Sequence, residues 1–252
     1  IVSPGGTGLL YTGASARLSF ALGRSGYIPG PFARLTPRGT PLFALAFSFL
    51  CGLVLFLPFP GWQQLVGFIS AAAVIAYAMV PLSLGALRRQ DPQRLRPFRL
   101  PAASLVAPAS FVVASEILLF TGWAVVWKIV VAILIGLALL TVSMLTETSE
   151  RRPSLDWRSA VWFWPYLLGM GAISYLSSFD TGTPSSVPLV GLDGPRNELT
   201  FGWDMLAVAI FSVGVYAFAI RSRLPAGQAL DYVGDLSAEA EADDAPTRPV
   251  RS

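Results

Sequence analysis

The stretch that decides the fold runs from Gly5 to Pro41 and reads GGTGLLYTGASARLSFALGRSGYIPGPFARLTPRGTP. Its first half is apolar and rich in small residues, and Arg17 is its one charge before residue 24. Its second half places arginines among glycines and prolines. Small residues let helices approach closely in lipid, whereas they give little bulk to a water-soluble core. The stretch therefore predicts a membrane-spanning helix that leads into a basic loop, and we expect later spans to pack around it.

The composition excludes several classes of protein. The 252 residues are 54% hydrophobic and 13% charged, whereas soluble domains carry about 25% charged residues. A net charge of +3 is too small to favour nucleic acid as a partner. The chain has no histidine, which removes histidine metal sites, bases and proton relays, and we expect no metal and no cofactor. Cys51 is the one cysteine, so no intrachain disulfide can form.

Seven apolar segments follow one another along the chain. A helix needs about 20 residues to cross the hydrocarbon core of a bilayer. The predicted spans are residues 4–23, 41–59, 62–87, 102–121, 123–145, 160–179 and 203–220. The fold class is therefore predicted to be an all-α membrane protein with about seven transmembrane helices.

Arginines gather in alternate connections between these spans. Thirteen basic residues lie in the loops 24–40, 88–101 and 146–159 and directly after the last span, whereas Arg196 is the one basic residue in the opposite loops. Basic residues accumulate on the cytoplasmic side of membrane proteins. We therefore expect the chain to enter from outside and to end in the cytoplasm. Residues 221–252 are acidic and poor in apolar side chains, which predicts a disordered cytoplasmic tail.

Three ionisable residues fall inside the predicted spans: Arg17, Glu116 and Lys128. Charges in a bilayer are costly and are usually paired, reach toward the interface or serve function. At 1.5 Å per residue, Glu116 and Lys128 lie at a similar depth of roughly 7–8 Å, so we expect a structural ion pair between them. Two alternatives stay open, which are separate contacts to the interface and a proton-coupling role for Glu116. For Arg17 we expect a local contact rather than contact with a substrate.

Two motifs carry a family resemblance. The first is the TGASARLSFALGRSGYIPGPFARLTPRGTP run, and the second is ALRRQDPQRLRPFRLP at residues 86–101. Both resemble amino acid permeases of the amino acid–polyamine–organocation (APC) superfamily, in the eighth span with its loop and after the tenth span. The loop matches are Gly26, Pro29, Phe32, Ala33, Arg34, Leu35, Gly39, Thr40 and Pro41. The segment WPYLLGMGAISYLSSF is similar to a bacterial subgroup that includes aspartate–proton symporters.

The resemblance implies a LeuT-like inverted-repeat transporter fold, of which this chain is expected to be the C-terminal part. Residues 1–101 would hold core helices eight to ten, residues 102–220 four peripheral helices, and residues 221–252 the tail. The N-terminal half, with the helices that bind most of the substrate, would be a partner of this chain. A chain that begins at Ile1 rather than at a methionine is consistent with that expectation.

The resemblance also implies candidate substrate residues. Tyr11 matches a position where relatives place an aromatic side chain in the substrate cavity, and Thr12 and Ser15 lie near a place where sodium-coupled relatives hold an ion. Ser70 on the third span could face the outer vestibule. Helix packing is the alternative role for each of these residues.

We therefore expect a non-enzymatic secondary transporter of amino acids in the bacterial inner (plasma) membrane. Proton-coupled symport is the preferred activity, with sodium as the other coupling ion, and the outer spans are a candidate homo-oligomer face. The alternatives are a polyamine or cationic amino acid exchanger and a non-transporting membrane scaffold.

Overall fold

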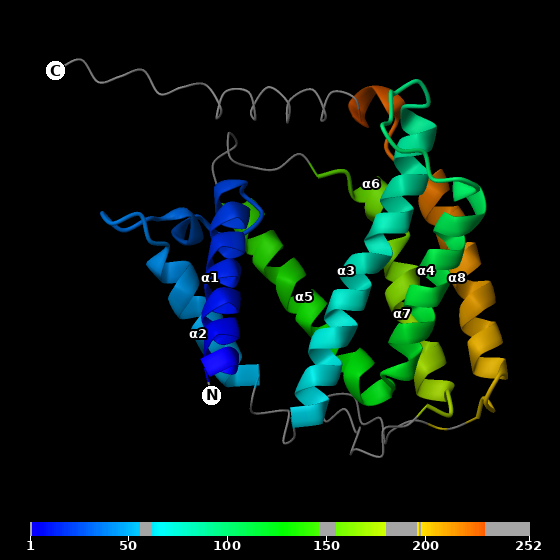
Figure 1. The fold of residues 1–252 in the computed structure, drawn as a ribbon, viewed down its shortest axis with the longest axis horizontal. Coiled ribbons are helices and arrows are strands. Elements are labelled where there is room, and N and C mark those ends of the chain that lie inside the picture. Colours follow the sequence, from blue (N-terminus) through cyan, green and yellow to red (C-terminus); the bar gives the residue numbers. More distant parts are fainter. Residues whose placement is uncertain (1, 56–61, 147–154, 180–195, 197, 230–252) are drawn as a thin grey trace. The chain divides into compact units, whose positions relative to one another are not determined.

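The computed structural model describes residues 2–55, 62–146, 155–179, 196 and 198–229. The described part is almost entirely helical (Figure 1). Its elements are α1 (Val2–Arg24), the 3₁₀ helix η1 (Gly30–Ala33), α2 (Leu42–Leu55), α3 (Trp62–Gln90), α4 (Ala103–Phe120), α5 (Trp123–Thr146), α6 (Trp157–Ala160), α7 (Phe163–Leu176) and α8 (Trp203–Arg221).

Each of the seven predicted spans contains a helix. The largest difference concerns the predicted span 160–179, where α7 covers 14 residues. The short α6 precedes it, capped by Asp156, whose carboxylate accepts hydrogen bonds from Arg158 N at 2.9 Å and Ser159 Oγ at 3.0 Å. At the other end, Ser177 adopts an extended conformation with φ −71° and ψ 157° and so stops the helix.

Four helices are long and apolar enough to cross a membrane in the part of the chain that the structure describes. They cover Leu65–Gln90, Ala103–Phe120, Trp123–Thr146 and Trp203–Arg221. The apolar stretch Leu42–Leu53 in α2 is shorter, α7 has 14 residues, and α1 is diluted by glycine, serine and threonine. The all-α membrane fold is confirmed, and four of the about seven predicted spans meet the requirement of length and composition. Residues 56–61, which hold the predicted Pro60–Gly61 turn, lie outside the described residues.

The chain divides into two compact units. The first comprises Ile1–Ala72, Trp123–Leu155 and Thr181–Gly194, and the second comprises Ala73–Gly122, Asp156–Asp180 and Pro195–Ser252. Helix α3 therefore contributes its first part to one unit and its second part to the other. The predicted roles of residues 1–101, 102–220 and 221–252 in a transporter stay predictions, and residues 230–252 of the predicted tail lie outside the described part.

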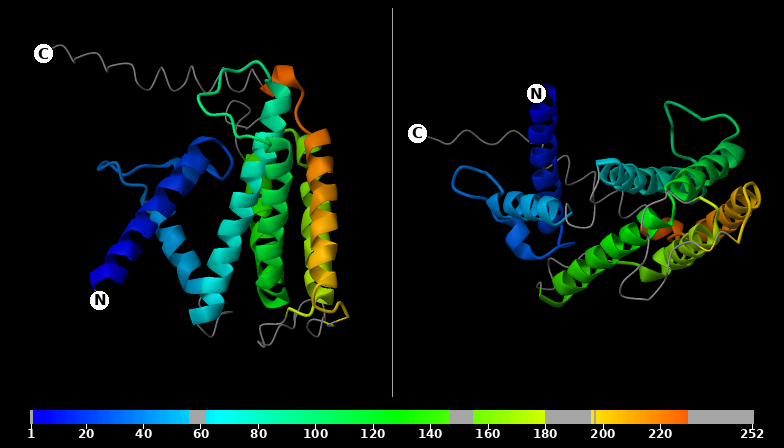
Figure 2. Two further views of the ribbon diagram at one scale, coloured as in Figure 1. Left: turned by 45° about the vertical axis from the view of Figure 1, so that its right-hand side comes forward. Right: turned by 90° about the horizontal axis from the view of Figure 1, so that it is seen from below.

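In the first unit, α1, η1 and α2 share a small aromatic core. Phe32 of η1 is 4% exposed and packs against the buried Ala16 of α1 and Ala44 of α2. Its ring meets those of Phe43 and Phe47 edge to face, with centroids 4.9 Å apart in both pairs. This edge-to-face arrangement is a favoured geometry for aromatic rings, and it holds the loop after α1 against both helices (Figure 2).

Two glycines explain why this loop can fold back. A Cβ atom on Gly23 would lie 2.8 Å from Phe32 Cβ and 2.9 Å from Ala33 N, so only glycine leaves room for η1. Gly26 adopts a φ of 76° just past the end of α1, where a left-handed residue commonly terminates a helix. The carbonyl oxygen of Gly26 accepts a 2.8 Å hydrogen bond from the buried Ser143 Oγ of α5.

In the second unit, α4, α7 and α8 form a bundle that is joined by α3. Glycines allow the close approaches, since a Cβ on Gly169 of α7 would overlap the ring of Phe211 and one on Gly85 of α3 would overlap Tyr216. The fully buried Phe111 of α4 packs against the ring of Tyr166, with centroids 5.2 Å apart. Small residues at helix crossings are the usual means of packing helices in lipid.

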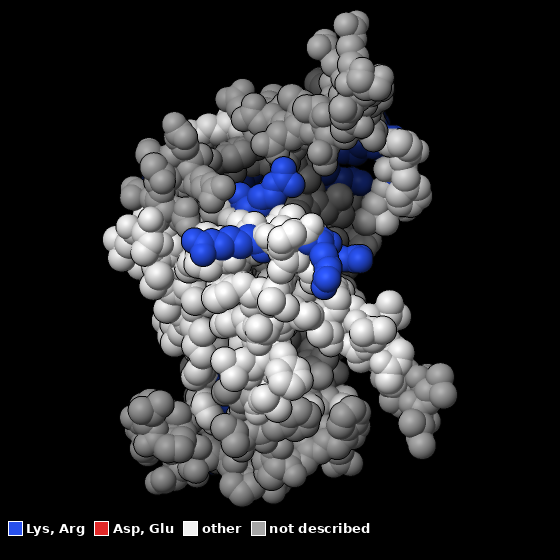
Figure 3. All heavy atoms as spheres, turned by 90° about the vertical axis from the view of Figure 1, so that its left-hand side faces the viewer, with Lys and Arg blue, Asp and Glu red and all other residues white. Residues whose placement is uncertain are grey.

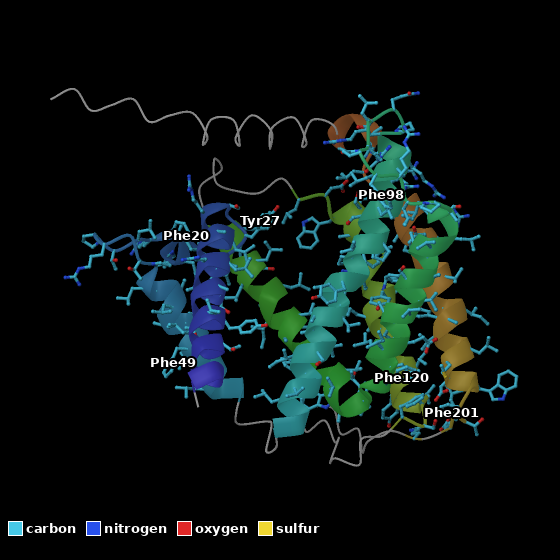
Figure 4. The ribbon with its side chains drawn as sticks, in the orientation of Figure 1. Phe20, Tyr27, Phe49, Phe98, Phe120 and Phe201 are labelled. Atoms are coloured by element: carbon cyan, nitrogen blue, oxygen red, sulfur yellow. The ribbon has the colours of Figure 1, made fainter. Side chains whose placement is uncertain are left out.

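The two ends of the second unit differ in charge. At one end lie the last turns of α3 and α8 and the starts of α4 and α7, together with Phe98 (Figure 4). The basic residues of this end are Arg88, Arg89, Arg94, Arg96, Arg99, Arg158, Arg221 and Arg223. At the opposite end lie Phe120, Phe201 and the first turn of α8 (Figure 4). Within this unit α3 and α8 therefore run in one direction and α4 and α7 in the other, which agrees with the order of spans in the arginine pattern.

The first unit shows a similar concentration of charge. Arg24, Arg34 and Arg38 are exposed in the connection from α1 to α2. In Figure 3, the blue basic side chains lie mainly in the upper part of the view. The described residues below them are mostly white, that is, uncharged. A band of charge beside an apolar surface is typical of helices that enter lipid from an aqueous interface.

Candidate functional site

The predicted substrate residues on α1 share one exposed flank of the helix. Tyr11 is 71% exposed, and Thr12 and Ser15 are also exposed. The buried Ala16, which packs in the core around Phe32, lies four residues after Thr12 and therefore on the same side of α1 as Thr12. The hydroxyl of Thr12 donates a 2.7 Å hydrogen bond to Gly8 O within its own helix. An aromatic ring and the Ser15 hydroxyl are therefore accessible on this flank.

The structure does not bring the other candidates of the first unit to this flank. Arg17 is exposed on α1, but six residues at 100° per residue place it about 120° around the helix from Tyr11. Ser70 is exposed on the first part of α3. No described contact joins Ser70 to Tyr11, Thr12 or Ser15 among the residues that the structure places.

Glu116 and Lys128, the predicted ion pair, lie in different units. Glu116 belongs to α4 of the second unit and Lys128 to α5 of the first, so their pairing stays a prediction. The Lys128 ammonium lies 5.7 Å from the ring centroid of Trp127, within the range of a cation–π contact. Glu116 is half-buried, and its Oε2 atom is buried without a hydrogen-bond partner in the described part of the chain.

Within its own unit, Glu116 lies in electrostatic reach of a second carboxylate, Asp204. Asp204 stands in the first turn of α8 and is fully buried. Asp204 is not among the predicted site residues. An acidic residue in the first helical turn after Gly202, which adopts a φ of 98°, is nevertheless a recognisable signal for a helix start. Asp204 is thus a second acidic group near Glu116.

Hydrogen bonds satisfy both oxygens of the Asp204 carboxylate. Ser177 Oγ and Ser178 Oγ donate to Oδ2 at 2.9 and 3.0 Å. The backbone N–H groups of Gly202 and Met205 donate to Oδ1 at 3.0 and 2.9 Å. A buried charge is tolerated where such donors replace water. Asp204 therefore ties the start of α8 to the end of α7. Each of its carboxylate oxygens already accepts two hydrogen bonds from the protein.

The chain just before α8 reinforces this connection. Arg196 N donates to Tyr175 O and Leu199 N to Leu176 O, both at 2.9 Å. The Arg196 guanidinium lies 5.8 Å from the centre of the Tyr175 ring and forms an exposed ion pair with Glu198 at 3.7 Å. A hydrogen bond between the side chains of Arg196 and Tyr175, separate from the backbone bond, is the main cause that raises the pKa of Arg196 above its usual value. These contacts hold the segment before α8 against the end of α7.

Polar groups elsewhere in the bundle are buried at helix crossings. Ser115 Oγ of α4 donates to Phe111 O at 3.0 Å and lies 3.2 Å from Tyr166 Oη. Ser174 and Ser212 are fully buried. No group of three or more histidine, cysteine, aspartate or glutamate side chains is arranged to hold a metal ion in the described residues. The described contacts of Ser115 thus join α4 to α7.

Comparisons with known proteins find relatives among bacterial transport proteins. Two proteins of Bacillus subtilis (strain 168) are 32% identical to this chain. The "Glutamate/serine transporter AimA" is similar over 235 residues, which are 93% of this chain and 40% of that protein. The "Aspartate-proton symporter" is similar over 234 residues, 92% of this chain and 42% of that protein. The "Branched-chain amino acid permease BcaP" of the same organism is 25% identical over 128 residues, 49% of this chain and 26% of the permease.

The chain spans about two fifths of the length of the first two relatives. No protein-family profile matches it, and no solved structure matches it. The helices that can cross a bilayer and the transporter relatives together define a multi-pass α-helical membrane protein rather than an enzyme. Within that class, the relatives are amino acid transporters and a permease, which agrees with the resemblance of the two loop motifs to amino acid permeases of the APC superfamily.

Proposed function

We propose that this chain is the C-terminal part of a secondary amino acid transporter and contributes scaffold helices to it. The observation that carries the proposal is the similarity to two amino acid transporters over more than nine tenths of the chain. The names of both relatives include an acidic amino acid, glutamate together with serine in one and aspartate in the other. An acidic amino acid is therefore the proposed substrate class, with proton-coupled symport as the proposed mode.

The exposed flank of α1 is the proposed contribution to the transport path. Tyr11 and Ser15 are exposed, whereas Ala16 and Phe32 are buried in the core of this unit. A hydroxyl and a tyrosine ring suit a polar passage or a neighbouring helix better than hydrocarbon. In this proposal the flank, with Thr12, faces the substrate-binding helices of the N-terminal half, and Ser70 of α3 separately faces the outer vestibule.

Uptake by the full protein in proteoliposomes tests the activity. We expect labelled aspartate or glutamate to accumulate when the outside is made acidic, and a protonophore to abolish the accumulation. A sodium gradient without a proton gradient is the control for the coupling ion. Absence of uptake for every amino acid tried would reject the proposal, and exchange of lysine or putrescine instead would favour the polyamine or cationic amino acid exchanger.

Glu116 is the coupling candidate within this chain, and the predicted structural ion pair with Lys128 is the alternative role. The Glu116→Gln variant separates the two roles, because glutamine keeps the shape and cannot carry the proton. Proton-driven uptake that persists in this variant would leave Glu116 a structural residue. Loss of the pH dependence with substrate binding retained would assign it to coupling.

The proposed orientation places the C-terminus in the cytoplasm of a bacterial cell. A Cys51→Ser background allows single cysteines at Arg94 and Arg196 to be labelled from outside. We expect the impermeant reagent to reach position 196 and not position 94. Labelling of both positions from the same side would overturn the threading.

A further inference from the structure

A cavity of about 340 Å³ lies in the second unit, at its basic end. It lies within the range of about 300–1,000 Å³ typical of ligand pockets. Its apolar wall is built by Leu82 and Leu87 of α3 and Ile220 of α8, and Trp162, Gln90 and Arg223 complete the rim. Gln90 Nε2 donates a 2.8 Å hydrogen bond to Leu224 O, which joins the ends of α3 and α8 across the rim.

The surroundings of the cavity are strongly basic. Arg223 lines the cavity, is exposed, and uses Nη1 to donate a 2.8 Å hydrogen bond to Ile220 O, so its charge is held beside the opening. Arg88 donates to Leu100 O at 3.2 Å, and Arg96 to Asp91 O at 2.6 Å. These are backbone acceptors, so no carboxylate neutralises the three guanidinium groups within the described residues.

The acidic side chains of this end are few. Asp156 uses its carboxylate to cap α6 through Arg158 N and Ser159 Oγ. Asp91 follows α3 directly, and its contact to Arg96 is made by the carbonyl oxygen. The charge at the opening is therefore positive overall, and an anion is the complementary occupant.

An apolar path leads from the cavity along α3. Val80, Ser83 and Leu87 recur at helical spacing, and Val80 is 63% and Leu87 47% exposed. Phe98, which is 74% exposed at this end (Figure 4), marks the level of an interface where aromatic rings gather. An occupant with an anionic head and an apolar tail would fit the cavity and this path together.

We propose that the cavity binds the phosphate headgroup of an anionic phospholipid, with Arg223 beside the phosphate and an acyl chain along Val80 and Leu87. Basic pockets between membrane helices are suited to anionic headgroups because the arginine charges lie at headgroup depth. Arginine also offers several N–H donors to phosphate oxygens. The site needs no contribution from the transport path, so it stands independently of the proposed function.

Native mass spectrometry of the full protein in detergent tests the site. Dioleoyl phosphatidylglycerol and dioleoyl phosphatidylcholine are added separately, and the bound lipids are counted. We expect phosphatidylglycerol to bind more tightly, and Arg223→Gln to weaken it about fivefold, as expected for one arginine at a membrane surface. Arg223→Lys keeps the charge and should retain most of the preference. Arg38→Gln, an exposed arginine of the first unit, is the matched control and should change nothing.

A second variant separates the cavity from its surface charge. Ser83 lines the cavity, is exposed, and bonds to Met79 O on its own helix at 2.9 Å, so Ser83→Trp fills the space without removing a contact between helices. We expect this variant to lose the bound phosphatidylglycerol with all arginines in place. Wild-type binding by Ser83→Trp, or equal binding of both lipids by the unmodified protein, would overturn the proposal.

Two further arms distinguish other occupants. Displacement of the lipid by the same concentration of inorganic phosphate would show a site for a free anion and would contradict the lipid assignment. A chain shortened after residue 229 removes the acidic residues that follow. Phosphatidylglycerol binding that appears only after this shortening would identify those residues as the occupant and would also contradict it.

Discussion

The α1–η1–α2 core and the α4–α7–α8 bundle solve helix packing in different ways. The first packs aromatic rings around Phe32 and leaves one flank of α1, with Tyr11 and Ser15, exposed. The second closes on itself, with Asp204 and several serines buried between its helices. The difference suggests separate tasks, because an open flank can meet further helices, whereas the hydrogen bonds of Asp204 tie helices of the bundle to one another.

The sharpest test of the closed bundle is Asp204→Ala. The change leaves two hydroxyls and two backbone N–H groups without their acceptor, and we expect the free energy of unfolding to fall by about 3–5 kcal/mol. The free energy of unfolding is measured by adding sodium dodecyl sulfate to the protein in a mild detergent. Asp204→Asn keeps one acceptor oxygen and should lose less. The exposed Glu198→Ala is the control, and an equal loss there would refute the special role of Asp204.

Removal of the Phe32 ring tests the aromatic core of the first unit. Phe32→Ala should lower the free energy of unfolding by about 3 kcal/mol, because the ring is buried and its partners cannot fill the space. Phe49→Ala on α2 removes a ring that is 65% exposed and should have little effect. The same unfolding titration measures both, and similar losses would mean that Phe32 does not form the core.

A methyl group at Gly23 tests the close approach of η1 to α1. Gly23→Ala should destabilise the protein by about 1–3 kcal/mol, since the new Cβ collides with backbone and with Phe32 Cβ. Gly13→Ala on the same helix meets nothing within 4 Å and should be neutral or stabilising, because alanine favours helix. If the two variants behaved alike, helix propensity rather than packing would govern this region.

The exposed flank of α1 should respond in function and not in stability. Tyr11→Ala is expected to change the free energy of unfolding by less than about 0.5 kcal/mol, because the ring is 71% exposed. Under the proposed function, its KM for the acidic amino acid should rise while the amount of folded protein is unchanged. Leu18→Ala, 64% exposed on the same helix, is the control for a general loss of surface area. An unchanged KM would leave Tyr11 a packing residue.

Much of the fold could be read from local patterns. The apolar runs predicted a helix in each of the seven segments, and the motif around Arg34 and the second motif, which contains Phe98, identified the family that the relatives confirm. The site was less predictable. Tyr11, Thr12 and Ser15 do share an exposed flank, but Ser70 and Arg17 do not join it, and the predicted partner of Glu116 lies in another unit.

By itself, the sequence determined that this is an all-α membrane protein with basic helix connections, because lipid demands long apolar runs and charges remain at the interface. Only the tertiary structure decided which face of α1 is buried, which groups donate hydrogen bonds to Asp204 and where the cavity beside Arg223 forms. Each of these depends on atoms brought together from distant parts of the chain, such as Ser177 and Asp204, which are 27 residues apart. A local pattern contains no record of such contacts, since hydrogen bonding and packing act between neighbours in space.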